Sequence, residues 1–156
     1  MTKPPVSIAA FLAWLFLFEC ILVGTIILVS INLPAIQGPL ISVIAIIGII
    51  VICRAALKLL WNRMLAEYPL QEIPAHAESK RFQSFSLNFV NMGLCIKATV
   101  DDTYLHIEPM LLIRALGAAS ASIPFADMTP IRGGRSVRVG PWTLHGPKWC
   151  LARASD

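Results

Sequence analysis

Two apolar stretches decide the fold of this chain: VSIAAFLAWLFLFECILVGTIILVSINL at residues 6–33 and LISVIAIIGIIVICRAALKLLW at residues 40–61. A helix rises 1.5 Å per residue, so about 20 residues cross a hydrocarbon core about 30 Å thick. Between the stretches lies LPAIQGP at residues 33–39, whose prolines and glycine end a helix and permit a tight reversal. The sequence therefore predicts a hairpin of two transmembrane helices over residues 1–61.

The composition agrees with a membrane segment followed by a polar domain. Of the 156 residues, 56% are hydrophobic and 14% are charged, and the mean hydropathy is +0.71. Soluble domains have about 45–50% apolar and about 25% charged residues. The surplus is uneven, because Glu19 is the one acidic or basic residue between Pro4 and Cys53, whereas residues 62–156 hold ten Lys/Arg and eight Asp/Glu. This second part is long enough for one small domain and too short for a two-lobed enzyme.

The basic residues predict the orientation of the hairpin. Lys3 precedes the first stretch, and Arg54, Lys58 and Arg63 follow or end the second, while the connecting loop has neither Lys nor Arg. Because cytoplasmic flanks carry the excess of Lys and Arg, we expect both termini in the cytoplasm, with the chain anchored in a bacterial inner membrane. Thiols stay reduced there. The four cysteines, which lack metal or redox spacing, are therefore expected to be free: Cys20, Cys53, Cys95 and Cys150.

Glu19 is a carboxylate inside an apolar stretch, which is costly and calls for a partner. If the turn centres near Ile36, Glu19 lies about 18 Å below the last turn of the first helix and Arg54 about 21 Å below the start of the second, so their depths match within one helical turn. We expect this intramembrane pair to lock the hairpin. Two alternatives stay open: a protonated Glu19 bonded to a neighbour, and Glu19 docking against a partner helix, which Gly24 and Gly48 would let approach closely.

Residues 62–80 are expected to hold the end of the second helix and a linker. Trp61 and Tyr68 suit the aromatic belt at the membrane surface. The residue before a proline disfavours helix, so we expect the helix to stop before Pro69. The remaining residues up to 80 are typical of a linker.

From residue 81 onward apolar and polar residues alternate, which predicts strands. CIKATV at residues 95–100 and TYLHIE at residues 103–108 flank two aspartates, the spacing of a two-residue hairpin. This register would give one core face and one solvent face. The expected partners are Ile96 with Ile107 and Ala98 with Leu105 on the core face, and Lys97 with His106 and Thr99 with Tyr104 on the solvent face.

Further strands are expected between turns rich in glycine and proline. About seven short strands predict a small antiparallel all-β domain over residues 81–156, either a sheet or a partly closed barrel. The other expected strands are residues 82–90, 110–116, 120–125, 135–139, 142–144 and 149–152.

Three segments carry a resemblance to a known family. They are WNRMLAEYP at residues 61–69, the hairpin that contains Leu105, and IPFADM at residues 123–128. The chain resembles small bacterial membrane proteins with two N-terminal helices and a C-terminal β domain similar to pleckstrin-homology-like (PH-like) or GRAM-like modules. In such modules an Ile-Pro-aromatic-x-acidic segment precedes the later strands. No apolar C-terminal helix is evident, so the resemblance implies a partial PH-like barrel or sheet, and it implies no activity.

The polar residues show no catalytic pattern. His76, His106 and His145 are expected on a linker, a solvent-facing strand and a turn, without the spacing of metal ligands. Asp101 and Asp102 are expected to shape a tight turn, where their side chains diverge, and not to act as an acid/base pair. We therefore expect a protein that is not an enzyme and has no metal or cofactor.

The charge distribution indicates a basic C-terminal end. Residues 62–127 have a net charge of −2, whereas residues 128–156 have a net charge of +4. Arg132 and Arg135 would face each other across a Gly-Gly turn, a like-charge pair that destabilises the hairpin unless an anion lies between them. With Arg138 they are the candidate contacts for an anion or a lipid headgroup. The alternative is a solvated hairpin tip.

Two functions follow from these features. In the first, the β domain of a membrane-anchored interaction module binds a protein or peptide, at an exposed strand edge or beside Trp142 and Trp149. In the second, the basic end binds anionic lipid headgroups or organises the membrane. Nucleic acid is not expected as a partner, because the net charge is small and no platform of aromatic and basic residues is evident.

Overall fold

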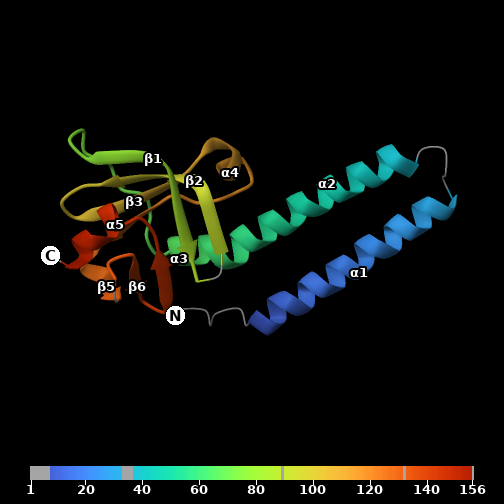
Figure 1. Cartoon of the computed structure of the whole chain (residues 1–156), viewed down its shortest axis with the longest axis horizontal. Coiled ribbons are helices and arrows are strands. Elements are labelled where there is room, and N and C mark those ends of the chain that lie inside the picture. The colour runs from blue at the N-terminus through green and yellow to red at the C-terminus, as the bar shows by residue number, and fades with distance from the viewer. Residues whose placement is uncertain (1–7, 33–36, 89, 132, 156) are drawn as a thin grey trace. The chain divides into compact units, whose positions relative to one another are not determined.

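The computed structural model describes residues 8–32, 37–88, 90–131 and 133–155. It divides into two units, residues 1–55 and 56–156. The first unit is a helical hairpin and the second is an antiparallel β domain (Figure 1), so the predicted fold class is confirmed. Lys3 and Ile36, on which the orientation and the turn position depend, lie outside the described residues.

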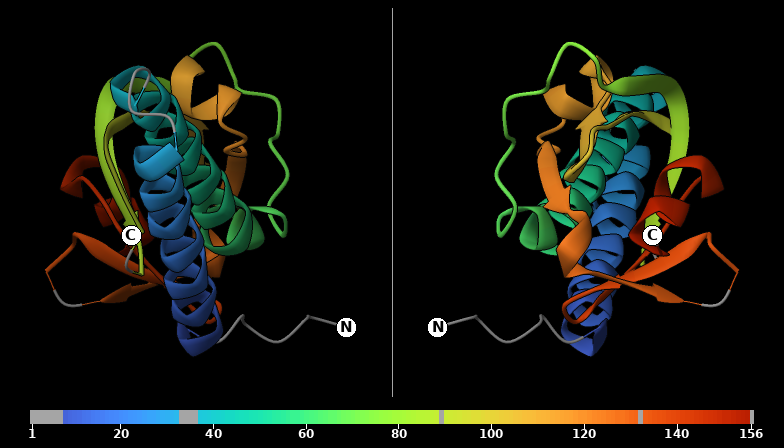
Figure 2. Two further views of the ribbon diagram at one scale, coloured as in Figure 1. Left: turned by 90° about the vertical axis from the view of Figure 1, so that its right-hand side faces the viewer. Right: turned by 90° about the vertical axis from the view of Figure 1, so that its left-hand side faces the viewer.

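The hairpin consists of α1 (Ile8–Asn32) and α2 (Gln37–Ala56), which run antiparallel side by side (Figures 1 and 2). Both helices are long and apolar enough to cross a membrane. Among the residues of α1 and α2 whose burial the structure describes, only Gly48 is buried inside the molecule. Gly48 permits close approach, because a Cβ there would lie 3.4 Å from the methyl groups of Leu22.

The segment after α2 belongs to the β domain. A π-helical turn, η2 (Leu57–Trp61), leads into α3 (Asn62–Leu65). Trp61 and Met64 are fully buried in the core of the β domain. Trp61 therefore does not lie in an aromatic belt as the sequence predicted, because its ring fills the domain core and its Nε1 donates a hydrogen bond to the Ala119 carbonyl over 3.4 Å.

Seven antiparallel strands form one sheet in the order β4-β3-β2-β1-β7-β6-β5. The end strands of that order are joined by the short 3₁₀ turn η3 (Phe125–Asp127), so the sheet is nearly closed (Figure 2). The strands are β1 (Glu78–Leu87), β2 (Val90–Val100), β3 (Tyr104–Pro109), β4 (Ala121–Pro124), β5 (Met128–Ile131), β6 (Ser136–Val139) and β7 (Trp142–His145).

Two predicted strands are wrong. Residues 110–116 contain a short helix, α4 (Leu111–Ala115), because a short apolar run is compatible with a helix as well as with a strand. Residues 149–152 lie in α5 (Lys148–Leu151) and η4 (Ala152–Ser155). Since α5 buries Cys150 and Leu151 in the core, a short helix covers the sheet where the sequence suggested a strand. The sequence interpretation also missed β5.

The predicted β2–β3 hairpin exists with its register shifted by two residues. Val100 pairs with Leu105 and Ala98 with Ile107. The loop is closed by the Asp101 N–H, which donates to the Tyr104 carbonyl over 3.2 Å. Because side chains alternate with a period of two, this shift keeps Ala98 and Leu105 on the core face. The opposite face is not solvent-exposed as predicted, since Thr99 and His106 on it are buried.

Candidate functional site

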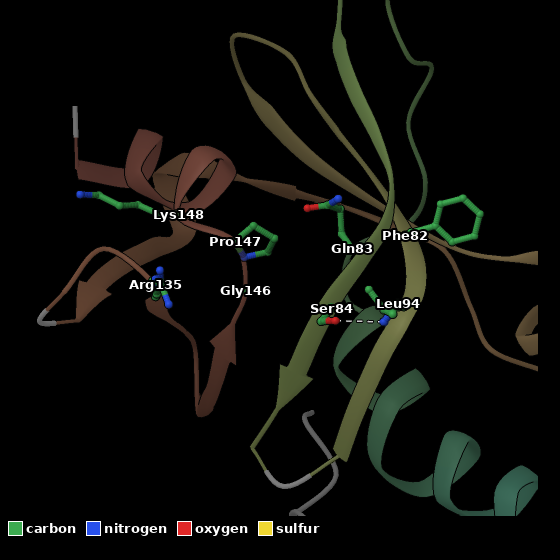
Figure 3. A pocket seen from close by; sticks show the side chains of 8 residues that line it. All are labelled: Phe82, Gln83, Ser84, Leu94, Arg135, Gly146, Pro147 and Lys148. Carbon is green, nitrogen blue, oxygen red and sulfur yellow. Dashed lines mark hydrogen bonds between the residues drawn. The ribbon is translucent and has the colours of Figure 1, made fainter.

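A pocket of about 450 Å³ lies where the β1–β2 ribbon meets the turn from β7 to α5 (Figure 3). We call it the basic pocket, because its charged residues are Arg135 and Lys148 and its lining contains no acidic residue. Its residues are Phe82, Gln83, Ser84, Leu94, Arg135, Gly146, Pro147 and Lys148. Its size falls within the range of small-ligand sites.

Backbone irregularities shape the β1–β2 wall of the basic pocket. Phe82 and Leu94 both have a φ of 55°, a conformation that costs energy for bulky side chains. The pairing of β1 with β2 shifts on both sides of Gln83, as in a β-bulge. The ribbon bends here, and the Leu94 N–H donates to the Ser84 hydroxyl over 2.9 Å. As a result Phe82 and Leu94 are turned outward, with exposed fractions of 59% and 65%.

The opposite wall depends on Gly146. A Cβ at this position would lie 2.5 Å from the ring of the buried Phe85, a contact that only a glycine avoids. The Gly146 N–H donates to the Arg135 carbonyl over 3.0 Å and so holds the β5–β6 loop beside the end of β7. Lys148, the first residue of α5, follows directly. Arg135 and Lys148 therefore line one pocket although thirteen positions separate them.

Trp149, which the sequence singled out, supports the rim of the basic pocket. Its indole N–H donates to the Gln83 side-chain oxygen over 3.1 Å. The Lys80 ammonium lies 4.4 Å from the centre of its ring, a cation–π contact. Trp149 thus ties α5 to β1. Trp142 is not among the lining residues, and its indole nitrogen is buried without a hydrogen-bond partner among the described residues.

The structure brings together only part of the predicted basic set. Arg132 lies outside the described residues. Ile131 pairs with Ser136, so the loop between β5 and β6 spans four residues and not the predicted two. Arg135 belongs to that loop and lines the basic pocket. Arg138 is exposed on β6 and is not among the lining residues.

The predicted intramembrane pair consists of one residue of α1 and one residue of α2. Glu19 lies between Phe18 and Leu22, the residues that Gly48 faces, whereas Arg54 lies six positions, or about 9 Å, further along α2. Both side chains are exposed. No salt bridge among the described residues joins them, and the pairing stays a prediction.

A buried polar cluster in the β domain was missed by sequence reasoning. His106, fully buried, lies between Asp101 and Ser122. Its Nε2 lies 2.9 Å from an Asp101 carboxylate oxygen, and its Nδ1 lies 2.7 Å from the Ser122 hydroxyl. The prediction of a surface histidine is therefore wrong. The Gln71 N–H also donates to the Ser122 hydroxyl over 2.8 Å, so the cluster fastens the segment before β1 to the sheet.

Burial separates this cluster from catalytic chemistry. Ser122 is only 2% exposed, so its hydroxyl is closed to a substrate. Burial favours a raised pKa for the Asp101 carboxyl, but hydrogen bonds from the Tyr104 N–H, from His106 and from the Thr103 N–H outweigh it, and the pKa is below 3.8. Asp101 therefore shapes the turn, as the sequence predicted, and also anchors His106.

The remaining reactive groups form no site in the described part of the chain. Burial raises the pKa of the Cys150 thiol from 9.0 to about 12, which makes it a poor nucleophile. The other cysteines, Cys20, Cys53 and Cys95, are free like Cys150. Among the described residues no group of three or more His, Cys, Asp or Glu side chains is arranged to hold a metal ion.

In comparisons with known proteins, the chain matches no protein-family model, no curated protein and no solved structure. A function for this chain must therefore be argued from its own residues.

Proposed function

We propose that this chain is a non-enzymatic, membrane-anchored interaction module whose β domain binds a protein partner in the basic pocket. The partner segment pairs an acidic side chain, or a terminal carboxylate, with an apolar neighbour. The observation that carries the proposal is that Arg135 and Lys148 share one pocket with the outward-turned Phe82 and Leu94.

The chemistry of the lining supports a peptide over a small anion alone. Two cations without an acidic neighbour attract a carboxylate, and Arg135 can bind it through two parallel hydrogen bonds. Leu94 is exposed at the ribbon wall of the pocket and offers apolar area there, while the exposed Phe82 ring points away from Arg135 and Lys148 (Figure 3). Strand addition is less favoured, because the free side of β4 already carries a bridge from Pro69 to Ala121.

The hairpin serves as the anchor in this proposal. Most of its described large apolar side chains are exposed, which suits lipid as their surroundings. Arg54 and Lys58 lie near the end of the second apolar stretch, so the positive-inside rule favours a cytoplasmic β domain at a bacterial inner membrane. The nearly closed sheet agrees with the resemblance to PH-like modules.

Site-specific photocrosslinking of the full chain in native membranes tests the proposal. Benzoylphenylalanine in place of Leu94 is expected to give a protein adduct of defined mass, and Arg135→Glu or Lys148→Glu to reduce its yield by about tenfold, as for a lost charge-assisted contact. Arg138→Glu is the matched control, because it makes the same charge change outside the pocket and is expected to leave the yield unchanged. Absence of any protein adduct would contradict the proposal.

The second candidate is binding of anionic lipid headgroups by the basic end. It is favoured by the exposed Arg135 and Arg138, which form no salt bridge among the described residues. Each basic residue near an anionic leaflet contributes about 1 kcal/mol. In the same experiment this candidate predicts lipid adducts at position 94 and equal losses from Arg135→Glu and Arg138→Glu.

A further inference from the structure

The tip of α4 carries the two most exposed large apolar side chains among the described residues of the β domain. Leu111 and Leu112 stand next to each other with exposed fractions of 80% and 73%. Adjacent helical positions point about 100° apart, so the two side chains cover a broad outward face. These two leucines are therefore not part of the buried core of the domain.

The charges beside this tip are basic. A groove of about 190 Å³ next to Leu111 is lined by Arg81, Arg114 and the ion pair of Lys97 with Glu108. The Lys97 ammonium lies 2.6 Å from the Glu108 carboxylate, so these two charges cancel. No salt bridge within the described part of the domain includes Arg81 or Arg114, which leaves the groove with two uncompensated positive charges.

The loop after α4 is fastened to the segment by which the chain enters the β domain. The Asn62 side chain donates to the Gly117 carbonyl over 2.7 Å and accepts from the Ala119 N–H over 2.8 Å. Asn62 lies six positions after Ala56, which a helix spans in about 9 Å. Because Ala56 is the first residue of the β domain, the loop that carries α4 is fastened within a few residues of the point where the chain enters this domain.

We propose that the α4 tip inserts Leu111 and Leu112 into the interface of the anionic leaflet next to the β domain, while Arg81 and Arg114 contact lipid phosphates. A bilayer fits better than a protein partner, because the tether is short and keeps the tip at high effective concentration near lipid. Two leucines flanked by arginines also match the apolar and basic faces of interfacial membrane segments. The inference goes beyond the proposed function and uses residues outside the basic pocket.

The test is photocrosslinking of the full chain in vesicles that contain about one-third phosphatidylglycerol, a typical anionic fraction. Benzoylphenylalanine in place of Leu112 is expected to form lipid adducts at least about fivefold more often than the same group in place of Leu70, a leucine that is 46% exposed elsewhere on the domain. Replacing these exposed leucines removes no core contact. Equal yields at the two positions would overturn the proposal.

A charge variant separates the bilayer from other occupants. Arg114→Glu is expected to lower the lipid adduct at position 112 by about fivefold in anionic vesicles, and by much less in phosphatidylcholine vesicles. Arg138→Glu makes the same charge change away from α4 and is expected to leave that adduct unchanged. Equal losses from the two variants, or adducts with a second copy of the chain or another protein in place of lipid, would show that α4 does not contact the leaflet.

Discussion

At the scale of single residues, the Asp101–His106–Ser122 cluster shows how a catalytic-looking set of side chains serves structure. Each polar atom of the cluster has a partner, as buried polar groups require. The Asp101 carboxylate accepts from the Nε2–H of His106, which leaves Nδ1 to accept from the Ser122 hydroxyl. The chain of hydrogen bonds continues to the Gln71 N–H. It joins the β2–β3 loop, β3, β4 and the segment before β1.

Asp101→Asn is expected to destabilise the β domain by about 1–3 kcal/mol at neutral pH, because the charge that accepts these hydrogen bonds is lost. The pKa of Asp101 is lower in the folded domain than its ordinary value. Its stabilisation is therefore fully present above the unfolded pKa and disappears as the pH falls through the folded pKa. Urea unfolding of the full chain in detergent micelles, followed by tryptophan fluorescence from pH 7 to about pH 2, measures this.

Asp102→Asn is the matched control for this prediction. Its carboxylate is 91% exposed, and its contact with His76 spans 4.0 Å. We expect this variant to have the same free energy of unfolding as the unmodified chain at every pH. The difference in the free energy of unfolding between Asp101→Asn and the unmodified chain is expected to shrink in acid. A difference that stays constant would contradict the assigned role of the carboxylate.

At the scale of elements, η2 and α3 convert the end of an apolar helix into part of a domain core. Trp61, Met64 and Leu65 are buried with the residues of the sheet. Asn62 then fastens the loop after α4 through a donor and an acceptor on one side chain. The amide makes both contacts at once, because its nitrogen donates and its oxygen accepts.

Asn62→Asp is therefore expected to destabilise the β domain by about 1–2 kcal/mol, since a carboxylate cannot donate to the Gly117 carbonyl and repels it. Asn91→Asp makes the same chemical change at an exposed position of β2 and is expected to have little effect. Thermal unfolding in micelles, followed by tryptophan fluorescence, distinguishes the two variants. Equal melting temperatures for both variants would refute this role for Asn62.

The hairpin permits a prediction at the same scale. If Glu19 and Arg54 pair in the membrane, Glu19→Gln and Arg54→Gln each leave an uncompensated charge and destabilise the chain more than the double substitution does. A double-mutant cycle on thermal stability in lipid nanodiscs measures the coupling. The control is a second cycle that combines Glu19→Gln with Lys58→Gln, in which the losses of thermal stability should add. Additivity in the Glu19–Arg54 cycle itself would mean that the two residues are not paired.

At the scale of the whole molecule, the division into an apolar hairpin and a β domain was predictable from sequence, because hydropathy is a local property of the chain. The β2–β3 hairpin was predictable for the same reason, although not its register. Alternation specifies which face a residue such as Ala98 takes, and a shift of two residues preserves it. Helices α4 and α5 were not predictable, since their short apolar runs are equally compatible with strands.

The site was less accessible to sequence analysis than the fold. The basic C-terminal end predicted Arg135 as a candidate, but its partnership with Lys148 and Phe82 depends on contacts between β1, β7 and α5. No local sequence pattern predicts that the Phe85 ring approaches Gly146 closely. Nor does one predict that Phe82 and Leu94 turn outward at a bulge. Likewise the burial of His106 follows from the segment that covers the sheet, and not from the alternation of β3.

By itself, the sequence determined that two helices of membrane-spanning length precede a small β domain, and that the basic charge lies toward the C-terminal end. These properties need only nearest neighbours in the chain and the transfer of side chains from water. The tertiary structure alone decided which cations share a pocket, which histidine is buried and which leucines remain outside. Those outcomes depend on contacts between residues far apart in sequence, such as Trp61 with Ala119 and Gly146 with Phe85, which form only when the sheet closes around its core.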